Sequence, residues 1–336
     1  MSRSSGAISA ETVQEAVQVS NIRNIAIIGT GLVGSGMASL FIANGYRVRM
    51  LGISDAECDR GLKQVKENLA DLVAEGILPE AMPAKFLERL SFTQAYSDLE
   101  GTDFVLEAVF ERLDVKQSVY RLLEPHIGPD VVIASVTSAI PPNSLAESMA
   151  HRQRLIVAHP WNPPHLIPNI EVVRSDYTDD VSVDTLVALF ESVNRTVVVL
   201  RKSIEGFIGN RLQHSLYREA IHLIEAGVAT PEEIDKVVLS SFGPRFSSVG
   251  VLEYFDSCNL DLHYDVQTRL FPTLCNDAAP QKLVMDYIQR GELGLKTGKG
   301  LFEWDDAHKA DFRHRKSAPF FKYFVWKENE DEGSRH

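Results

Sequence analysis

The stretch IAIIGTGLVGSGMASLFIANGYRVRMLGIS, residues 25–54, places a glycine cluster between an apolar strand pattern and an apolar helix pattern. Gly29, Gly31 and Gly34 have the spacing G-x-G-x-x-G, and Gly36 adds a fourth glycine. In this context the first glycine permits a tight turn, the second lets the backbone approach a pyrophosphate, and the third lets the helix pack on the strand. The stretch therefore predicts a dinucleotide-binding unit.

The predicted helix, from about Val33 to Asn44, begins between the second and third glycines of the fingerprint. The backbone N–H groups of Leu32 and Val33, with the positive end of the helix dipole, would face the negative charge of the phosphates. At the end of the next strand, where an Asp or Glu commonly accepts hydrogen bonds from the adenosine ribose, the chain has Gly52. Because an acid there would repel a 2′-phosphate, its absence leaves NADP open beside NAD.

Side chains near Gly52 bear on that choice. Arg47 and Arg49 lie on the preceding strand, while Ser54 and Asp55 follow it. NADP sites usually place a cation close to the 2′-phosphate, and the sequence does not show whether either arginine reaches that point. The Ser54 hydroxyl could donate a hydrogen bond to a phosphate, whereas the Asp55 carboxylate would repel one. We expect NAD as the cofactor, with NADP as the alternative.

Composition limits the partners of the chain. Its 336 residues carry a formal net charge of −12, which argues against nucleic acid and against an anionic membrane surface. Cys58, Cys258 and Cys275 are widely separated, which predicts neither disulfides nor a zinc site and indicates a reducing, cytoplasmic location. Residues 1–20 lack the apolar core of a signal peptide, and we expect a flexible N-terminal arm there.

Short apolar runs alternate with helical patterns from residue 24 to about residue 174. The runs are apolar nearly throughout, as strands covered on both faces of a parallel sheet tend to be. The alternation predicts a doubly wound, Rossmann-type α/β sheet. The expected strands are IAIIG, YRVRML, DFVLEAV, VVIASV and RLIVAHP, with NIEVVRS and TVVVL beyond them.

Two departures from this alternation define the domains. A long helical pattern from Ala56 to about Arg89, broken near Pro79, predicts a helical hairpin inserted into the sheet domain. After about Lys202 strands nearly vanish, so an all-α C-terminal domain is expected. The predicted boundaries are residues 1–20 for the arm, 21–202 for the sheet domain, 203–306 for the helical domain and 307–336 for a C-terminal tail.

A second informative stretch is IVAHPWNPPHLIPNIEVV, residues 156–173. His159 ends an apolar strand at the edge where ligands of such sheets gather, and Glu171 lies in another extended run. An imidazole beside a carboxylate suits alcohol oxidation: the imidazole takes the hydroxyl proton, and the carboxylate orients the ring and stabilises its charged form. On composition alone, a non-catalytic interpretation is favoured, because a histidine at a strand end and an exposed glutamate are common.

Six motifs stand in one order along the chain: the glycine fingerprint, LEAVFERLDVK (106–116), SVTSAIP (135–141), AHPWNPP (158–164), GFIGNRL (206–212) and GLKTGKGLFEW (294–304). With these motifs in this order, nearly the whole chain from Asn24 to Trp304 resembles the L-3-hydroxyacyl-CoA dehydrogenase family. The resemblance implies that His159 is the general base or acid at the substrate oxygen, that Glu171 orients it, and that no metal is needed.

The resemblance also assigns roles to four further positions. Ser138 and Asn210 would hydrogen-bond the substrate oxygen or support His159. Glu111 and Lys116 match positions near the nicotinamide half of the cofactor. The chain departs from the family pattern where an Asn is common, at Val136 and Arg112.

The loop after the histidine strand bears on the substrate. Acyl-CoA members tend to have HFFNP, whereas HPWNPPHLIP here is closer to a branch acting on free hydroxy acids, which includes L-gulonate 3-dehydrogenase, its lens lambda-crystallin relatives and L-carnitine dehydrogenase. Arg245, in FGPRFSSVGVLE (242–253), resembles an arginine of the gulonate group, and its planar fork suits a small carboxylate. We expect an NAD-dependent enzyme that oxidises the 3-hydroxy group of a gulonate- or carnitine-like acid.

Other functions stay open at this point. A CoA thioester would favour basic residues on the inserted hairpin, where Lys63 and Lys66 lie, so an L-3-hydroxyacyl-CoA dehydrogenase is the alternative. A non-catalytic, crystallin-like structural role is less favoured. The implied catalytic residues are all present in the sequence: His159, Glu171, Ser138 and Asn210. The resemblance also implies a homodimer formed through the helical domain.

Overall fold

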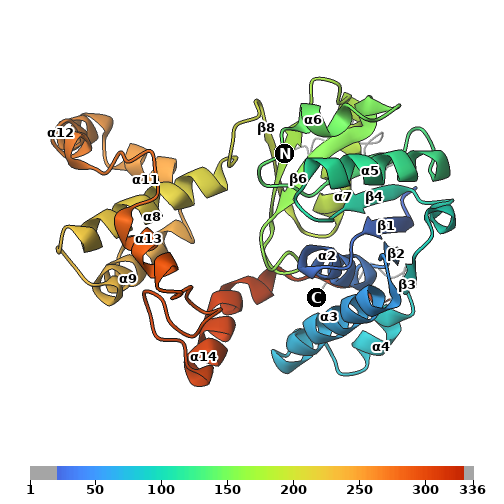
Figure 1. Cartoon of the computed structure of the whole chain (residues 1–336), viewed down its shortest axis with the longest axis horizontal. Coiled ribbons are helices and arrows are strands. Elements are labelled where there is room, and N and C mark those ends of the chain that lie inside the picture. The colour runs from blue at the N-terminus through green and yellow to red at the C-terminus, as the bar shows by residue number, and fades with distance from the viewer. Residues whose placement is uncertain (1–20, 329–336) are drawn as a thin grey trace, which may run out of the picture. The chain divides into compact units, whose positions relative to one another are not determined.

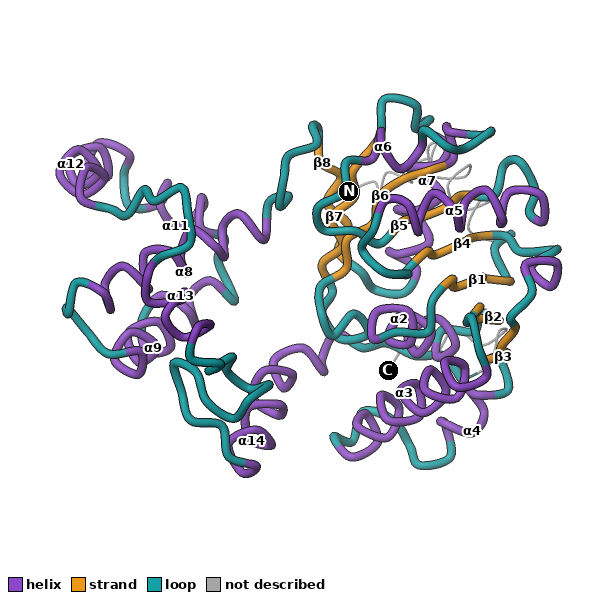
Figure 2. Tube along the Cα trace, viewed as in Figure 1, coloured by secondary structure: helices purple, strands orange, loops and turns teal. Residues whose placement is uncertain are grey.

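The computed structural model describes residues 21–328, so the expected N-terminal arm lies outside the described residues. The described chain divides into two compact units, residues 208–315 and the remainder. All eight strands of the described chain belong to the first unit, and the second is built from helices (Figure 1, Figure 2). The predicted fold class, a Rossmann-type sheet followed by a helical region, is confirmed.

The strands form one sheet in the order β3-β2-β1-β4-β5-β6-β7-β8. Strands β1 to β6 are parallel to one another, β7 is antiparallel to β6, and β8 is parallel to β7. The carboxyl ends of β1 to β6 therefore share one edge, the edge at which ligands bind to such sheets. The strands are β1 (Asn24–Ile28), β2 (Arg47–Leu51), β3 (Leu90–Thr93), β4 (Phe104–Glu107), β5 (Val132–Ser135), β6 (Leu155–Pro160), β7 (Asn169–Arg174) and β8 (Thr196–Leu200).

Helices cover both faces of this sheet (Figure 1). In β1, Ile25 and Ile27 pack in a core cluster with α2, α3 and α7, whereas Ala26 and Ile28 pack in a second cluster with α5 and α6. Successive side chains of a strand point to opposite faces, so burial on both sides explains the nearly continuous apolar runs. The helices are α2 (Leu32–Ala43), α3 (Asp55–Ala74), α4 (Met82–Leu87), α5 (Leu113–Leu123), α6 (Pro142–Ala146) and α7 (Asp180–Ser192).

The inserted hairpin consists of α3 and α4, and the break between Ala74 and Met82 contains the predicted interruption. Strand β3, which follows α4 and pairs with β2 at the sheet edge, is not among the strands expected from the sequence. Its sequence, LSFT, contains one exposed and three half-buried residues. A strand this short, polar and half-exposed carries almost no periodic signal.

The second unit is described by its helices. They are α8 (Gly209–Glu225), α9 (Pro231–Ser240), α10 (Phe242–Phe246), α11 (Val251–Ser257), α12 (Leu260–Leu270), α13 (Lys282–Gln289) and the greater part of α14 (Asp306–Ser317). Thr230 caps α9, with its hydroxyl accepting from the Glu233 N–H and the Glu233 carboxylate accepting from the Thr230 N–H. Within residues 21–328, no helix has the length and apolar character that spanning a bilayer requires.

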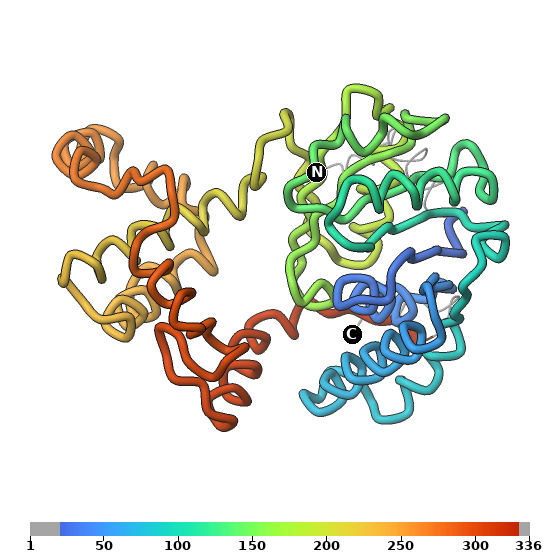
Figure 3. Tube along the Cα trace, viewed as in Figure 1, coloured from blue at the N-terminus to red at the C-terminus, as the bar shows by residue number. Residues whose placement is uncertain are grey.

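The chain returns to the first unit after Arg315, and in Figure 3 its red end lies beside the blue N-terminal part. Phe324 is buried in the core cluster of α2, and the Trp326 ring centroid lies 6.2 Å from that of Phe86. The Lys327 N–H donates to the Ala43 carbonyl at 2.8 Å. Residues 307–336 were expected to be a separate C-terminal tail, whereas residues 316–328 are part of the sheet unit.

Candidate active site

The glycine fingerprint leaves space beside its backbone. Gly29 has a φ of +107°, which favours glycine, and a Cβ there would lie 2.5 Å from the carbonyl oxygen of Ala108 on the loop after β4. At Gly31 a Cβ would meet no atom within 4 Å, so the backbone borders open space. At Gly34 a Cβ would collide with the Gly29 carbonyl, so glycine lets α2 start close to β1.

The first turn of α2 suits an anion. Its N-cap, Gly31, has no side chain to accept from the helix amides, and the first turn contains no acidic residue. The N–H groups at the helix start are therefore available to a negatively charged group, which the helix dipole also favours. These residues fit a dinucleotide: Gly31, Leu32 and Val33 would hold its pyrophosphate.

The two arginines before Gly52 do not serve the nucleotide end of β2. Arg47 Nε donates to Asn24 Oδ1 at 2.9 Å, and Arg49 Nε donates to Ser91 Oγ at 3.4 Å. Both arginines are among the residues that line a cavity at the amino ends of the first strands, and Arg49 Nη1 donates to the Asp98 carbonyl. The cation that a 2′-phosphate would need is thus not supplied from β2.

The polar residues after Gly52 are engaged locally. Ser54 is the N-cap of α3, and its hydroxyl accepts from the Glu57 N–H at 3.3 Å. Asp55 Oδ1 accepts from Gln94 Nε2 at 2.5 Å. Both residues therefore shape the start of α3.

His159 and Glu171 face each other across the pair of strands β6 and β7. They are directly opposite in the register, and His159 Nδ1 lies 3.2 Å from Glu171 Oε2. The imidazole is 12% exposed and the carboxylate 2%. Opposite residues of an antiparallel pair lie on the same face, so reversing the chain after Pro160 brings the two groups together. With Nδ1 occupied, Nε2 is left for proton transfer.

Aromatic rings flank this pair. Trp161 Nε1 donates to Glu171 Oε2 at 3.5 Å. The Phe207 ring packs edge-on against the His159 imidazole, with ring centroids 5.3 Å apart. The two rings restrict water around the imidazole and the carboxylate.

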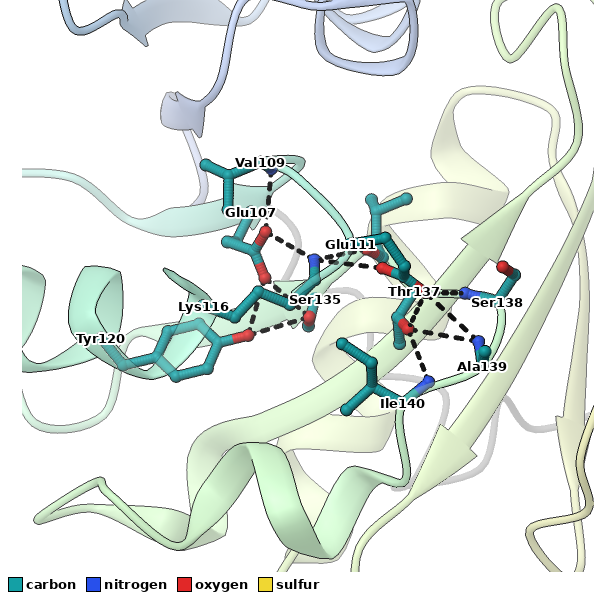
Figure 4. A network of polar contacts seen from close by, with 11 residues as sticks. Glu107, Val109, Glu111, Lys116, Tyr120, Ser135, Thr137, Ser138, Ala139 and Ile140 are labelled. Atoms are coloured by element: carbon teal, nitrogen blue, oxygen red, sulfur yellow. Dashed lines mark hydrogen bonds and ion pairs between the residues drawn. The ribbon is translucent and has the colours of Figure 1, made fainter. Parts of the chain in front are cut away.

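A fully buried ion pair lies below the loop after β5. Lys116 Nζ is 2.7 Å from Glu107 Oε1 and donates to the Val136 carbonyl at 2.7 Å (Figure 4). Tyr120 and Ser135 donate their hydroxyls to Glu107 Oε2, each at 2.7 Å. Burial, reinforced by Glu107, raises the pKa of Tyr120 well above its ordinary value, so its hydroxyl stays a donor. These donors compensate the desolvation of the carboxylate.

Glu111 connects that ion pair to the loop carrying Ser138. Its Oε2 lies 3.8 Å from Lys116 Nζ. Its Oε1 accepts from Thr137 Oγ1 at 2.5 Å and from the N–H groups of Ser138 and Ala139 at 2.9 and 3.3 Å. In Figure 4 the Ser138 hydroxyl points away from this network. The backbone is therefore fixed while the hydroxyl is left for another partner.

Ser138 lines a cavity of about 310 Å³ within the first unit. Phe207 is in contact both with the cavity of Ser138 and with the His159 imidazole. The other lining residues are Ala139, Ile140, Pro141, Ser203, Ile204 and Glu205.

Comparison with known proteins places these features in a family. The family model described as "3-hydroxyacyl-CoA dehydrogenase, NAD binding domain" matches residues 24–204, and that for the C-terminal domain of the same enzyme matches residues 206–304. The chain belongs to the 3-hydroxyacyl-CoA dehydrogenase family. The predicted family, the predicted cofactor NAD and the prediction of a dehydrogenase are confirmed.

Individual relatives act on different substrates. 5-Formyl-3-hydroxy-2-methylpyridine 4-carboxylate 5-dehydrogenase of Mesorhizobium japonicum is 35% identical over 284 residues, covering 84% of this chain and 90% of that protein. A crystal structure of an enzyme of this name, an NAD⁺ dependent dismutase, has a TM-score of 0.81 at 32% identity and covers 90% of this chain and 97% of that chain. L-carnitine dehydrogenase of Staphylococcus epidermidis is 32% identical, covering 67% and 69%. The crystal structure of (S)-3-hydroxybutyryl-CoA dehydrogenase from Ralstonia eutropha has a TM-score of 0.70 at 31% identity, covering 85% and 100%.

Two residues that the 3-hydroxyacyl-CoA dehydrogenase resemblance singled out lie in the second unit. Asn210 is half-buried at the second residue of α8. Arg245 is exposed on α10, and its guanidinium carbon lies 4.2 Å from the ring centroid of Tyr254. Their roles toward the substrate stay predictions.

Lys116 is fully buried: its side chain is 0% exposed and holds Glu107. The expected position of Lys116 near the nicotinamide half of the cofactor stays a prediction. Its partner was not singled out, although a glutamate at the end of an apolar strand in LEAVFE is a signal of a buried, paired charge. Gly36 was noted without a role: a Cβ there would lie 2.5 Å from Pro164 Cγ, so glycine lets the loop after β6 pack on α2.

Proposed function

We propose that this member of the 3-hydroxyacyl-CoA dehydrogenase family uses NAD to oxidise the hydroxyl of a small hydroxy carboxylic acid, with His159 and Glu171 handling the proton. One observation carries the proposal: the Glu171 carboxylate lies 3.2 Å from His159 Nδ1 at the carboxyl end of β6. An imidazole oriented in this way presents Nε2 at the edge of the sheet where the cofactor binds.

The proton follows a short route in this proposal. His159 Nε2 takes the proton of the substrate hydroxyl, and Glu171 stabilises the imidazolium that forms. Bound NAD supplies the acceptor for the hydride that leaves the same carbon. Ser138 and Asn210 hydrogen-bond the substrate oxygen, and Glu111 keeps the Ser138 backbone in place for this contact. In ketone reduction the same groups act in reverse.

A free acid is favoured over a thioester as the substrate. The pyridine carboxylate enzyme and L-carnitine dehydrogenase have names that state substrates with a free carboxylate. Arg245 offers an exposed guanidinium, braced on Tyr254, that can donate two parallel hydrogen bonds to such a group. On the hairpin, Lys63 lies 3.8 Å from Glu67, in the arrangement of a solvated ion pair. The family description itself keeps a 3-hydroxyacyl-CoA thioester as the alternative.

Initial rates of NADH formation test this assignment. The substrates are gulonate, carnitine, short 3-hydroxy acids, the pyridine aldehyde named for the first relative, and 3-hydroxybutyryl-CoA. We expect turnover of a free carboxylate and none of the thioester; turnover of the thioester alone would select the alternative. His159→Ala should abolish turnover while NADH binding persists, and full turnover by this variant would reject the proton-transfer role.

We also propose a homodimer formed through the second unit. Between residues 208 and 315, all of them described, Ile221 is the single apolar side chain classed as buried. On α12, Leu262, Val266 and Leu270 form one stripe and are 56%, 47% and 47% exposed. A unit of this length normally buries a core of its own. We therefore propose that a second copy of the chain covers the exposed apolar side chains of this unit.

Light scattering after size-exclusion chromatography tests the dimer. We expect twice the 37.4 kDa mass of the chain, and a lower mass for Val266→Asp, which places a charge in the stripe. A monomeric wild-type protein would overturn the proposal.

A cytoplasmic location completes the proposed function. It is supported by Cys58, Cys258 and Cys275, which are free thiols. Retention of His159 and Glu171 in hydrogen-bonding geometry speaks against a purely structural, crystallin-like role, and the turnover assay tests that role as well.

A further inference from the structure

The end of β2 lacks the acid that commonly binds the adenosine ribose, and the space for that acid is already taken. A Cβ added at Gly52 would lie 3.0 Å from Cys58 Sγ, 3.3 Å from Thr30 Cγ2 and 3.5 Å from Glu57 Cβ. Any larger side chain at Gly52 would therefore have to displace its neighbours. One of those neighbours, Glu57, is itself a carboxylic acid.

Glu57 accepts hydrogen bonds from the segment after β2 and from the glycine fingerprint. Its Oε2 accepts from the N–H of Ile53, the residue directly after Gly52, at 3.1 Å. Its backbone carbonyl accepts from the hydroxyl of Thr30, between the first two fingerprint glycines, at 3.0 Å. The carboxylate is thus held at the end of β2 from the first turn of α3.

The remaining carboxylate oxygen is accessible. The Glu57 side chain is 24% exposed, and Oε1 lies 3.9 Å from an Nη2 atom of Arg60, whose side chain is 68% exposed. A contact of that length to an exposed guanidinium is weak and leaves the oxygen able to accept hydrogen bonds. The neighbouring acid Asp55 is engaged with Gln94.

We propose that Glu57 replaces the missing acid of β2: its carboxylate accepts hydrogen bonds from the adenosine ribose hydroxyls of NAD and repels the 2′-phosphate of NADP. The inference rests on the use of NAD and is independent of the substrate. It makes Glu57 the residue that determines nucleotide specificity in this chain, at a position five residues beyond the usual one.

Glu57 also has a structural contact, which the test must separate from recognition. Together with Ser54 it has the S-x-x-E spacing of a capping box, and Ser54 Oγ accepts from the Glu57 N–H. Glu57→Gln keeps an oxygen for the Ile53 N–H, removes the charge and replaces the second acceptor oxygen with an NH2 donor. Asp55→Asn is the matched control, because it removes a charge from the same helix turn.

Direct binding of NADH and NADPH, followed by nicotinamide fluorescence, provides the readout without any substrate. For Glu57→Gln we expect the ratio of the NADPH to the NADH dissociation constant to fall by about tenfold, as a charged hydrogen bond is lost and the repulsion is relieved. For Asp55→Asn we expect the ratio to stay within about twofold of the wild type. The inactivity of any tested hydroxy acid does not affect this result.

Two outcomes would overturn the inference. The first is a Glu57→Gln ratio equal to that of the wild type, including the case in which both nucleotides weaken in parallel with a lower Tm, since that result assigns Glu57 to helix capping alone. The second is an equal change in Asp55→Asn, which would indicate a general charge effect of the α3 start.

Discussion

Glu111 fixes the backbone at Ser138: its Oε1 accepts the Ser138 N–H at 2.9 Å, although the two residues are 27 positions apart. The other carboxylate oxygen faces Lys116 at 3.8 Å, and Lys116 is held in turn by Glu107 at 2.7 Å. A buried charge in the sheet unit therefore determines where an exposed serine of the candidate active site lies. This arrangement makes Glu111 a positioning residue in our assignment.

Glu111→Gln should lower kcat by about tenfold, because a charged acceptor of several hydrogen bonds becomes a neutral one. The KM for NAD should change less. Steady-state kinetics on the substrate found in the initial-rate assay would measure both. Asp114→Asn is the control, because Asp114 pairs with exposed Arg112 outside the network. An unchanged kcat with a large loss of NADH affinity would instead indicate that Glu111 contacts the cofactor directly.

Glu171→Gln should lower kcat by between about 10² and 10⁴, since the neutral amide no longer stabilises the imidazolium of His159. The NADH dissociation constant should stay within about twofold, because the carboxylate is 2% exposed and lies in β7, away from the fingerprint. Pre-steady-state absorbance and NADH fluorescence would measure the two quantities. Glu191→Gln, on the exposed part of α7, is the control. A kcat near the wild-type value would contradict the orienting role.

His165 should make the fold sensitive to acid. Burial, with a smaller contribution from the Arg195 guanidinium, lowers the pKa of His165 to about 4, and its Nδ1 atom has no hydrogen-bond partner among the described residues. Since the unfolded chain binds this proton near pH 6.5, stability is lost as the pH falls from 6.5 toward 4, by about 3 kcal/mol at pH 4.

Urea unfolding between pH 7 and pH 4 would measure this loss. His165→Asn should be less stable at pH 7 and show a shallower decline toward acid than the wild type. His214→Asn, at an exposed position of α8, should leave the decline unchanged. Parallel pH profiles for the wild type and His165→Asn would refute the assignment.

The C-terminal segment should stabilise the sheet unit to which it returns. Phe324 is 4% exposed in the core cluster of α2, so Phe324→Ala should lower the free energy of unfolding by about 3–5 kcal/mol. Lys322→Ala, at an exposed position of the same segment, should change it by less than about 0.5 kcal/mol. Urea unfolding followed by circular dichroism tests the pair, and equal stabilities would mean that the segment contributes no core packing.

Local patterns account for the features that the sequence predicted correctly. The glycine spacing at residues 29–34 and the alternation of apolar runs with helical patterns predicted the sheet, because turn chemistry and side-chain periodicity act over a few residues. The proximity of His159 and Glu171 was also foreseeable: two extended runs separated by a short loop readily form an antiparallel pair. The family followed from several such motifs standing in order.

Other features depend on segments that are far apart in the chain. The sequence around Phe324 has no periodic pattern from which its packing on α2 could be predicted. In the same region, Asn44 Nδ2 donates to the carbonyl of Val325, which is 281 positions away in the chain. Tertiary packing also determines the contact of Arg49 with Ser91, the burial of Lys116 and the position of Glu57 beside Gly52. Residue type and spacing encode local conformation and much of the chemistry, whereas the partners of each charge are fixed by close packing of distant segments.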